Sequence, residues 1–313
     1  MYIPNMKIYF FGTPDFAVPT LKILALSKDF EIQKVVTQPD KPGDRGKITE
    51  PPVKIVADSL RLQVIQPEKI DVELIEKIKK DKPDAIVVVA YGELIPPELL
   101  TIPKYGCINV HPSLLPKYRG ASPIQEALLN GDKETGITIM KIDKELDHGA
   151  IFLIKRIPID QSDTYTSLSE KLAGASAIIL PLALNDIEQE ILTPLKQDDS
   201  KATFCRKISK EDGKIDLEKS GHEIINQIRA FNPWPSTYLN FNNKRLKIFE
   251  AKLQKPSKKE IPGKVVILSK ESFGIQTKDD LLVPTKIQIE GKSPVLAKEF
   301  LNGYMASLEK AKL

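Results

Sequence analysis

The sequence has little of what extracellular and membrane proteins need. It contains two cysteines, Cys107 and Cys205, among 313 residues. We therefore expect no disulfide framework, and we expect a cytoplasmic protein. It lacks any run of about 18 apolar residues, which argues against a membrane partner. The first apolar run, Ile8–Phe11, is too short for the core of a signal peptide. We expect it to be a strand, with Met6 as an alternative start to Met1.

Motifs that hold phosphates or metals are also missing. The sequence has no P-loop and no metal-type spacing of Cys and His, so we expect no metal. The segment 11–17, FGTPDFA, occupies the phosphate-loop position after the first strand but has one glycine, Gly12. Its Asp15 would repel a pyrophosphate. These features weaken a nicotinamide-binding interpretation.

The charge that is present is unevenly distributed. Hydrophobic residues make up 41% of the chain and charged residues 28%, as in an ordinary globular protein. Residues 1–209 carry 27 Lys and Arg against 29 Asp and Glu, whereas residues 210–313 carry 19 against 13. A basic C-terminal third suggests a polyanionic partner. The alternative is a solvated lysine surface, which charge alone favours.

The first half of the chain alternates strand-like and helix-like segments. Expected strands are Lys7–Phe11, Ile32–Thr37, Ala85–Ala90, Ile108–His111, Thr135–Ile142 and Ala150–Ile159. Expected helices are Val18–Leu26, Val53–Leu60, Val72–Lys80 and Thr164–Gln189. This alternation predicts the α/β class, with a doubly wound, mostly parallel, Rossmann-like sheet.

The pattern changes after the long helix. The polar segment 191–209 is predicted to be a linker between a domain at 1–190 and a domain at 210–313. In the second domain a helix at Gly221–Phe231 precedes five short strands and a closing helix at Val295–Leu308. The strands are expected at Thr237–Phe241, Leu246–Ala251, Lys264–Leu268, Phe273–Thr277 and Leu281–Ile289. Such spacing predicts a small β-barrel of the oligonucleotide-binding (OB) type.

The segment 107–112, CINVHP, combines residue types that can perform chemistry. Side chains alternate along a strand, so Asn109 and His111 share one face, with α-carbons about 6.5 Å apart. Strand ends form the ligand crevice of a parallel sheet, and Pro112 ends this strand. A lone histidine at the end of a strand more often has only a structural role, with its hydrogen bonds satisfied locally. The neighbouring Asn109 favours a functional site instead. Cys107 lies deeper on the same face, which favours a buried, inert thiol over a nucleophile.

Two further segments belong with this strand. In segment 113–120, SLLPKYRG, the prolines stiffen a loop that can present backbone groups and leucines to a planar ligand; a plain surface turn is the alternative. In segment 146–150, LDHGA, Asp147 could pair with His111 and keep it protonated, or it could only cap its own turn. We interpret the adjacent His148 as exposed and incidental.

A long loop follows the second strand. Segment 38–47, QPDKPGDRGK, exceeds the usual two to six residues of a βα loop and carries Lys41, Arg45 and Lys47. A basic loop at the ligand edge of the sheet could contact a phosphate backbone. A lysine-rich loop without a partner is an equally weighted alternative.

Along almost its whole length the sequence resembles the methionyl-tRNA formyltransferase family of folate-dependent formyltransferases. The resemblance is carried by FGTPDFA at 11–17, TQPDKP at 37–42, VAYG at 89–92, segment 106–120, ETGITIM at 134–140 and RAFNPWP at 229–235. It departs from the family pattern at Pro112, Tyr118 and His148.

The resemblance implies roles for particular residues. Asn109, His111 and Asp147 would be catalytic, and Ser113, Leu114, Leu115 and Pro116 would contact 10-formyltetrahydrofolate, the formyl donor. Arg45 would contact the acceptor end of tRNA, with Lys41 and Lys47 assisting. The implied reaction transfers the formyl group to the amine of methionyl-initiator tRNA, with no metal. A protonated His111 and Asn109 would stabilise the oxyanion while Asp147 orients a proton-carrying water.

Two other functions compete with this one. An enzyme with the same residues could formylate another amine, such as an amino sugar on a nucleotide, but the basic loop and basic C-terminal region argue against it. A non-catalytic RNA-binding protein would have no use for Asn109, His111 and Asp147. We expect a monomer.

Overall fold

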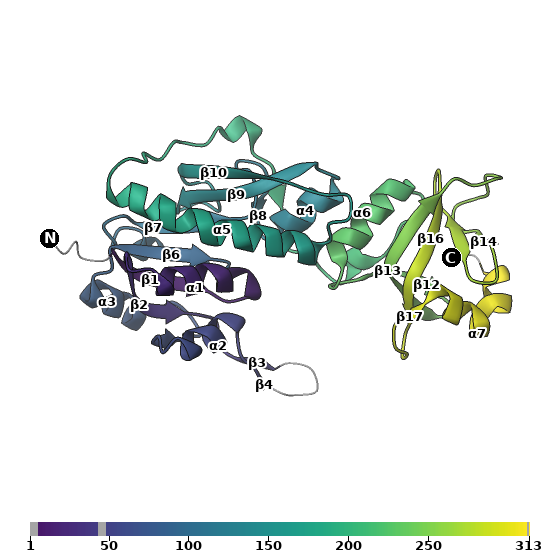
Figure 1. Ribbon diagram of the computed structural model, residues 1–313, viewed down its shortest axis with the longest axis horizontal. Coiled ribbons are helices and arrows are strands. Elements are labelled where there is room, and N and C mark those ends of the chain that lie inside the picture. Colours follow the sequence, from purple (N-terminus) through teal and green to yellow (C-terminus); the bar gives the residue numbers. More distant parts are fainter. Residues whose placement is uncertain (1–5, 43–47, 312) are drawn as a thin grey trace. The chain divides into compact units, whose positions relative to one another are not determined.

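The computed structural model describes residues 6–42, 48–311 and 313, and the chain folds into two compact units (Figure 1). Unit 1 takes in the chain up to residue 120 together with 134–158 and 169–205. Unit 2 contains 121–133, 159–168 and 206–313. The domain boundaries expected from the sequence, 1–190 and 210–313, differ from these units and stay a prediction about how the chain divides.

Unit 1 is built on a seven-stranded sheet in the order β10-β9-β7-β6-β1-β2-β5. Its strands are β1 (Met6–Gly12), β2 (Phe30–Val36), β5 (Val64–Ile65), β6 (Ala85–Val89), β7 (Cys107–His111), β9 (Glu134–Lys141) and β10 (Ile151–Pro158). Neighbouring strands from β5 to β7 are parallel, whereas β9 is antiparallel to both β7 and β10. The predicted, mostly parallel α/β fold is therefore confirmed.

Helices cover the sheet because their apolar residues recur on one side. These helices are α1 (Val18–Leu26), α2 (Pro52–Ser59) and α3 (Val72–Asp81). In α3 the buried residues are Leu74, Ile75 and Ile78, which pack in one cluster with Tyr9 and Phe11 of β1. Each such side chain contributes roughly 1.5–3 kcal/mol when buried. Asp71 caps this helix by accepting a hydrogen bond from Leu74 N at 3.0 Å.

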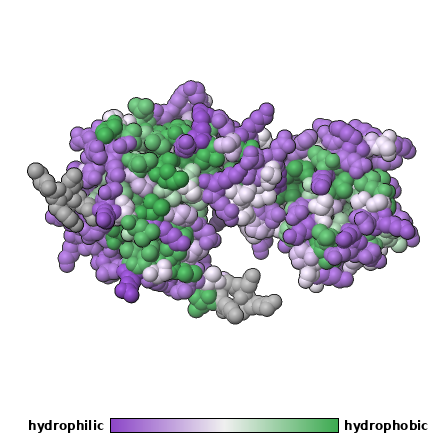
Figure 2. Space-filling model, viewed as in Figure 1, coloured by the Kyte–Doolittle hydropathy of each residue, from purple (hydrophilic) through white to green (hydrophobic). Residues whose placement is uncertain are grey.

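The long helix α5 (Tyr165–Glu188) lies beside α1, where buried hydroxyls of Thr20 and Ser176 approach to 3.0 Å (Figure 1). By length and composition alone α5 could cross a membrane, but half of its most apolar window is buried, as in the core helix of a globular protein. Figure 2 shows apolar residues on the side of unit 1 that faces the viewer, and Ile178 and Leu182 of α5 are exposed.

Unit 2 holds an antiparallel sheet in the order β12-β13-β16-β15-β14, with β17 paired to β16. Its elements are α4 (Pro123–Leu129), α6 (Gly221–Phe231), β12 (Thr237–Phe241), β13 (Lys244–Gln254), β14 (Val265–Ile267), β15 (Phe273–Gln276), β16 (Leu281–Ile289), β17 (Val295–Leu296) and α7 (Ala297–Glu309). Residues of α6, α7 and all the longer strands share one apolar core. The predicted small β fold of the C-terminal region is confirmed.

Most of the segment expected to be a linker, residues 191–205, belongs to unit 1, and residues 206–209 belong to unit 2. Strand β11 (Phe204–Cys205) pairs in parallel with β8 (Arg119–Gly120), and Gln197 is buried. Its polar composition concealed this because the buried polar groups are satisfied by partners far away in the sequence. The remaining elements are the hairpin strands β3 (Lys41–Pro42) and β4 (Ile48–Thr49) and short 3-10 helices at Asp15–Ala17, Pro97–Leu99, Asp199–Lys201 and Glu211–Gly213.

Candidate active site

Strand β7 delivers Asn109 and His111 to the carboxyl end of the parallel part of the sheet. It lies between parallel β6 and antiparallel β9, where His111 is opposite Thr138 and Asn109 is opposite Met140. Asn109 is half-buried and His111 is buried. Deeper in the strand, burial raises the pKa of the Cys107 thiol to about 12, which makes it a poor nucleophile at neutral pH.

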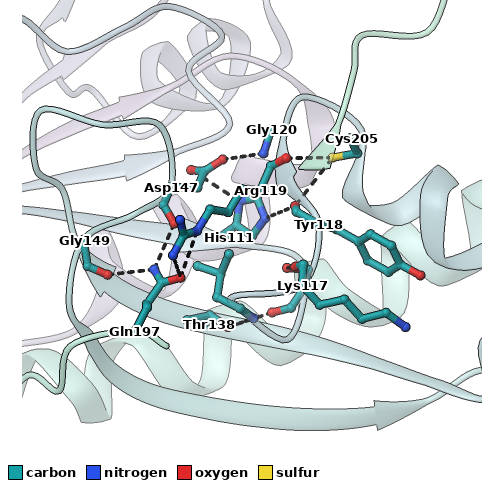
Figure 3. A network of polar contacts seen from close by, with 12 residues as sticks. His111, Lys117, Tyr118, Arg119, Gly120, Thr138, Asp147, Gly149, Gln197 and Cys205 are labelled. Atoms are coloured by element: carbon teal, nitrogen blue, oxygen red, sulfur yellow. Dashed lines mark hydrogen bonds and ion pairs between the residues drawn. The ribbon is translucent and has the colours of Figure 1, made fainter. Parts of the chain in front are cut away.

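The ring of His111 is held by its surroundings on both sides (Figure 3). Nε2 lies 2.9 Å from the backbone carbonyl oxygen of Tyr118. A carbonyl can only accept, so Nε2 carries a proton and donates it. Nδ1 lies 3.6 Å from Oδ1 of Asp147. Nδ1 is therefore the nitrogen left for a reacting group. The departure at Tyr118 leaves the contact intact because a backbone atom makes it.

Asp147 reaches the histidine from the loop between β9 and β10. Its other oxygen, Oδ2, accepts a hydrogen bond from the backbone N–H of Gly120 at 2.8 Å. Its backbone has φ of +51°, in the left-handed region that aspartate tolerates better than most residues. A side chain at Gly149 would meet the carbonyl oxygen of Lys141 at 1.8 Å, so the loop needs glycine there to fold back closely. The structure thus brings Asp147 and His111 together.

Further polar contacts, which no motif in the sequence indicates, support the loop that carries Asp147. Gln197 donates to the carbonyl oxygens of Asp147 at 2.9 Å and Gly149 at 2.8 Å. Its own amide oxygen accepts from Arg119 Nε at 3.1 Å and Nη2 at 2.8 Å. Arg119 also contacts Asp199 at 2.7 Å. The partners are 48 to 80 residues apart, so only their shared polarity could have hinted at the network.

Polar groups of the loop after β7 bond within the loop and to the neighbouring strand β9. The hydroxyl of buried Ser113 donates to the carbonyl of Lys117 at 2.6 Å. The buried Leu115 N–H donates to Thr138 Oγ1 at 3.2 Å. Leu114 and Pro116 are only partly buried. Of the four residues expected to contact folate, these two have the most accessible side chains, so they are best placed for apolar contact.

The basic loop after β2 begins and ends as a hairpin. Lys41 is exposed and pairs with Thr49 across β3 and β4, whereas Arg45 and Lys47 lie outside the described residues. Lys54 contacts Asp40 and Glu50, each at 2.8 Å, and so ties the two ends of the hairpin together. An open hollow of about 280 Å³ lies alongside, lined by Thr13, Gln38, Pro39, Lys41, Pro42, Thr49, Glu50, Pro51 and Pro52.

His148 is only partly exposed and contacts two acidic side chains, so our expectation that it is exposed was wrong. Its side chain is 22% exposed, with Nδ1 2.6 Å from Asp143 and Nε2 3.5 Å from Asp199. The hydrogen bond to Asp143 raises the pKa of His148 above its usual value. The tight turn of this loop folds it back onto its own acidic residue, which composition alone does not reveal. Among the described residues, no group of three or more His, Cys, Asp or Glu side chains could hold a metal ion.

Comparison with known proteins places this arrangement in a family. The model described as "Formyl transferase" matches residues 6–184, and "Formyl transferase, C-terminal domain" matches residues 207–305. Methionyl-tRNA formyltransferase of Halalkalibacterium halodurans is 44% identical over 301 residues, 95% of each chain. The chain belongs to the methionyl-tRNA formyltransferase family. The protein of that name from Sulfurihydrogenibium sp. is 43% identical, over 96% of this chain and 97% of its own.

Solved structures of more distant proteins share the fold. Methionyl-tRNA formyltransferase from Clostridium thermocellum has a TM-score of 0.57 at 20% identity, covering 80% of this chain and 94% of its own. The N-formyltransferase from Helicobacter canadensis, in complex with folinic acid and dTDP-3-aminofucose, has a TM-score of 0.67 at 20% identity, over 90% and 98%. At this identity the likeness concerns the fold, while the relatives above carry the family assignment.

Proposed function

We propose that this enzyme transfers the formyl group of 10-formyltetrahydrofolate to the amino group of methionyl-initiator tRNA, in the cytoplasm and without a metal. The observation that carries the proposal is the relationship to methionyl-tRNA formyltransferases over 95% of both chains. Two things support the folate donor: the Helicobacter canadensis relative is described in complex with folinic acid, and Leu114 and Pro116 offer partly exposed apolar surface in the loop that follows His111.

In the proposed mechanism the methionyl amine attacks the formyl carbon. The new C–N bond forms, the bond from carbon to the folate nitrogen breaks, and the amine proton passes to the leaving nitrogen. Negative charge develops on the formyl oxygen before that bond breaks. Asn109 and Nδ1 of a protonated His111 donate to this oxygen, and one such donor lowers the barrier by roughly 3–4 kcal/mol.

The contacts of His111 with Tyr118 and with Asp147 fit these proposed roles. Nε2 of His111 donates to the Tyr118 carbonyl, which fixes the ring so that Nδ1 faces Asp147. An Nδ1 to Oδ1 separation of 3.6 Å exceeds a normal hydrogen bond, so it leaves Nδ1 available to a substrate oxygen. The carboxylate of Asp147 stabilises the imidazolium and orients the water that carries the proton.

The proposal assigns tRNA binding to Lys and Arg side chains outside the group formed by Asn109, His111 and Asp147. Lys41, Arg45 and Lys47 of the basic loop would contact the acceptor end, and the basic residues of 210–313 would contact the phosphate backbone. On β13 these include the exposed Lys244, Arg245 and Lys252. Such contacts release counterions, so affinity for tRNA should fall as salt rises. A monomer suffices for this scheme, because all the proposed catalytic residues come from one chain.

The test offers the purified protein two amines. With 10-formyltetrahydrofolate as donor, charged methionyl-initiator tRNA should be formylated, and an amino sugar on a nucleotide should not. Transfer to the sugar alone would replace the acceptor in the proposal. No transfer to either amine, in a protein that still binds tRNA, would favour the non-catalytic RNA-binding alternative.

A further inference from the structure

The buried side chain of Gln197 makes a complete set of hydrogen bonds (Figure 3). Its two N–H groups donate to the backbone carbonyls of Asp147 and Gly149, and its oxygen accepts twice from Arg119. A carboxamide has two donor hydrogens and two acceptor lone pairs, so all are used. The partners also fix the orientation of the amide, since carbonyls face its nitrogen and guanidinium N–H groups face its oxygen.

The same contacts hold the one loop that presents Asp147. The two carbonyls that Gln197 binds belong to Asp147 itself and to the residue two positions later. Asp147 has a left-handed backbone, which persists only when its surroundings hold it. Arg119 precedes Gly120, whose N–H binds the Asp147 carboxylate at 2.8 Å. The strand β8 thus holds the carboxylate directly through Gly120 and the loop backbone indirectly through Arg119 and Gln197.

From this geometry we propose that Gln197, held by Arg119, is a positioning residue that sets the distance between the Asp147 carboxylate and Nδ1 of His111. The described contacts of its side chain are with Arg119 and the Asp147 loop, and it acts on the reaction through Asp147. The proposal rests on the proposed function, and it assigns a task in the site to the segment 191–209 that composition marks as a linker.

The variant Gln197→Glu separates positioning from packing. Glutamate has nearly the same size and keeps an acceptor for Arg119, so the ion pair should keep segment 197–199 in place. Its second oxygen cannot donate and would instead face the carbonyls of Asp147 and Gly149, which repel it. The loop should move by a fraction of an ångström or more, and a 1 Å misplacement at a reacting centre can cost about a hundredfold in rate.

The expected kinetic result is a fall in kcat of about tenfold to a hundredfold, with the KM values for donor and tRNA within about twofold. A second expectation is non-additivity. In the background of Asp147→Asn, adding Gln197→Glu should change kcat by less than about twofold, because the group it positions is already lost. Full additivity, or a rise in KM without a fall in kcat, would overturn the proposal.

Gln276 provides a matched control. It is also buried, donates to two backbone carbonyls, those of Thr277 at 3.0 Å and Asp280 at 3.3 Å, and accepts from the Glu260 N–H. It belongs to unit 2. Gln276→Glu should disturb a buried amide to a similar degree while leaving kcat within about twofold. An equal loss of kcat in both variants would mean that general destabilisation, and not the position of Asp147, explains the effect.

A structural measurement decides the question without turnover. Crystal structures of the wild type and Gln197→Glu at matched resolution should show the separation of His111 Nδ1 and Asp147 Oδ1 growing beyond the 3.6 Å found here. An unchanged separation would overturn the positioning role, even if the enzyme is active. A wild type without formyl transfer would instead overturn the proposed function, so the two failures are distinguishable. If Gln197→Glu folds poorly, Gln197→Met removes the same donors without adding charge.

Discussion

Two histidine–aspartate pairs lie near each other in unit 1, and they are built in opposite ways. His111 and Asp147 are buried or nearly so, come from different elements, and stay 3.6 Å apart. His148 and Asp143 belong to one loop, are more exposed, and form a hydrogen bond of 2.6 Å. We call His148–Asp143 the closed pair, because its members satisfy each other, and His111–Asp147 the open pair, because its longer separation leaves hydrogen-bonding capacity unused at a largely buried place. The contrast teaches that an incomplete contact can mark a reactive site.

The largest expected effect concerns the donor beside the open pair. Within the described residues, no hydrogen bond is found for the Asn109 side chain, which is half-buried next to His111. Asn109→Ala should lower kcat by about 100- to 1,000-fold, because one oxyanion donor is lost. Single-turnover formyl transfer at saturating tRNA measures this. Near-normal turnover would remove Asn109 from the mechanism, and an unchanged dissociation constant for tRNA is the control.

A smaller loss is expected from neutralising the open pair. Asp147→Asn keeps an oxygen for the Gly120 N–H but removes the negative charge that the proposed mechanism places beside His111. We expect kcat to fall by roughly tenfold to a hundredfold, which is less than for the loss of a direct donor. Steady-state kinetics and a crystal structure of the variant would check the rate and the loop. A loss equal to that of Asn109→Ala, with the loop in place, would give Asp147 a more direct role.

Substitutions in the basic loop should weaken tRNA binding and leave the two histidine–aspartate pairs unchanged. Lys41→Ala and Arg45→Ala should each raise the KM for tRNA severalfold at near-physiological salt while kcat stays the same. Each should reduce the slope of affinity against salt, in logarithmic units, by about one. Lys80→Ala, an exposed lysine at the end of α3, is the matched control. An equal effect of Lys80→Ala would mean that net charge, and not the loop, governs tRNA binding.

The smallest effect concerns the closed pair and pH. The Asp143 contact raises the pKa of His148 in the folded protein, so protonation of His148 adds stability. That contribution is fully present below the unfolded pKa of about 6.5 and is lost as pH rises through the higher folded pKa. The partly exposed pair should contribute no more than about 1 kcal/mol. Denaturation of wild type and His148→Asn at pH 5.5 and 8.5 should show a difference in unfolding free energy only at the lower pH. A difference that is the same at both pH values would contradict this account.

The sequence predicted the regular elements well and the site in part. Helices at Val18–Leu26 and Gly221–Phe231 and strands at Thr237–Phe241 and Leu281–Ile289 have the predicted bounds. Residues close by in the sequence determine where these elements begin and end, as in the capping box of Ser220 and Glu223 that starts α6. The proximity of Asn109 to His111 followed from strand alternation, which is also local.

What the sequence could not give depends on contacts between distant residues. The pairing of β8 with β11 and the contacts of Gln197 join segments 48 to 87 residues apart, and no periodicity encodes them. A polar, proline-containing segment such as 191–209 is typical of a linker until its partners are known. The tautomer of His111 likewise follows from the Tyr118 carbonyl, a backbone atom whose position the sequence does not specify.

The most direct test compares the two histidines in one assay. His111→Ala and His148→Ala are measured side by side for formylation of methionyl-initiator tRNA with 10-formyltetrahydrofolate at saturating substrates. The account predicts a kcat lowered by about a hundredfold or more for His111→Ala and by no more than about twofold for His148→Ala. Equal losses, or a larger loss for His148→Ala, would contradict the assignment of the open pair as the reactive one.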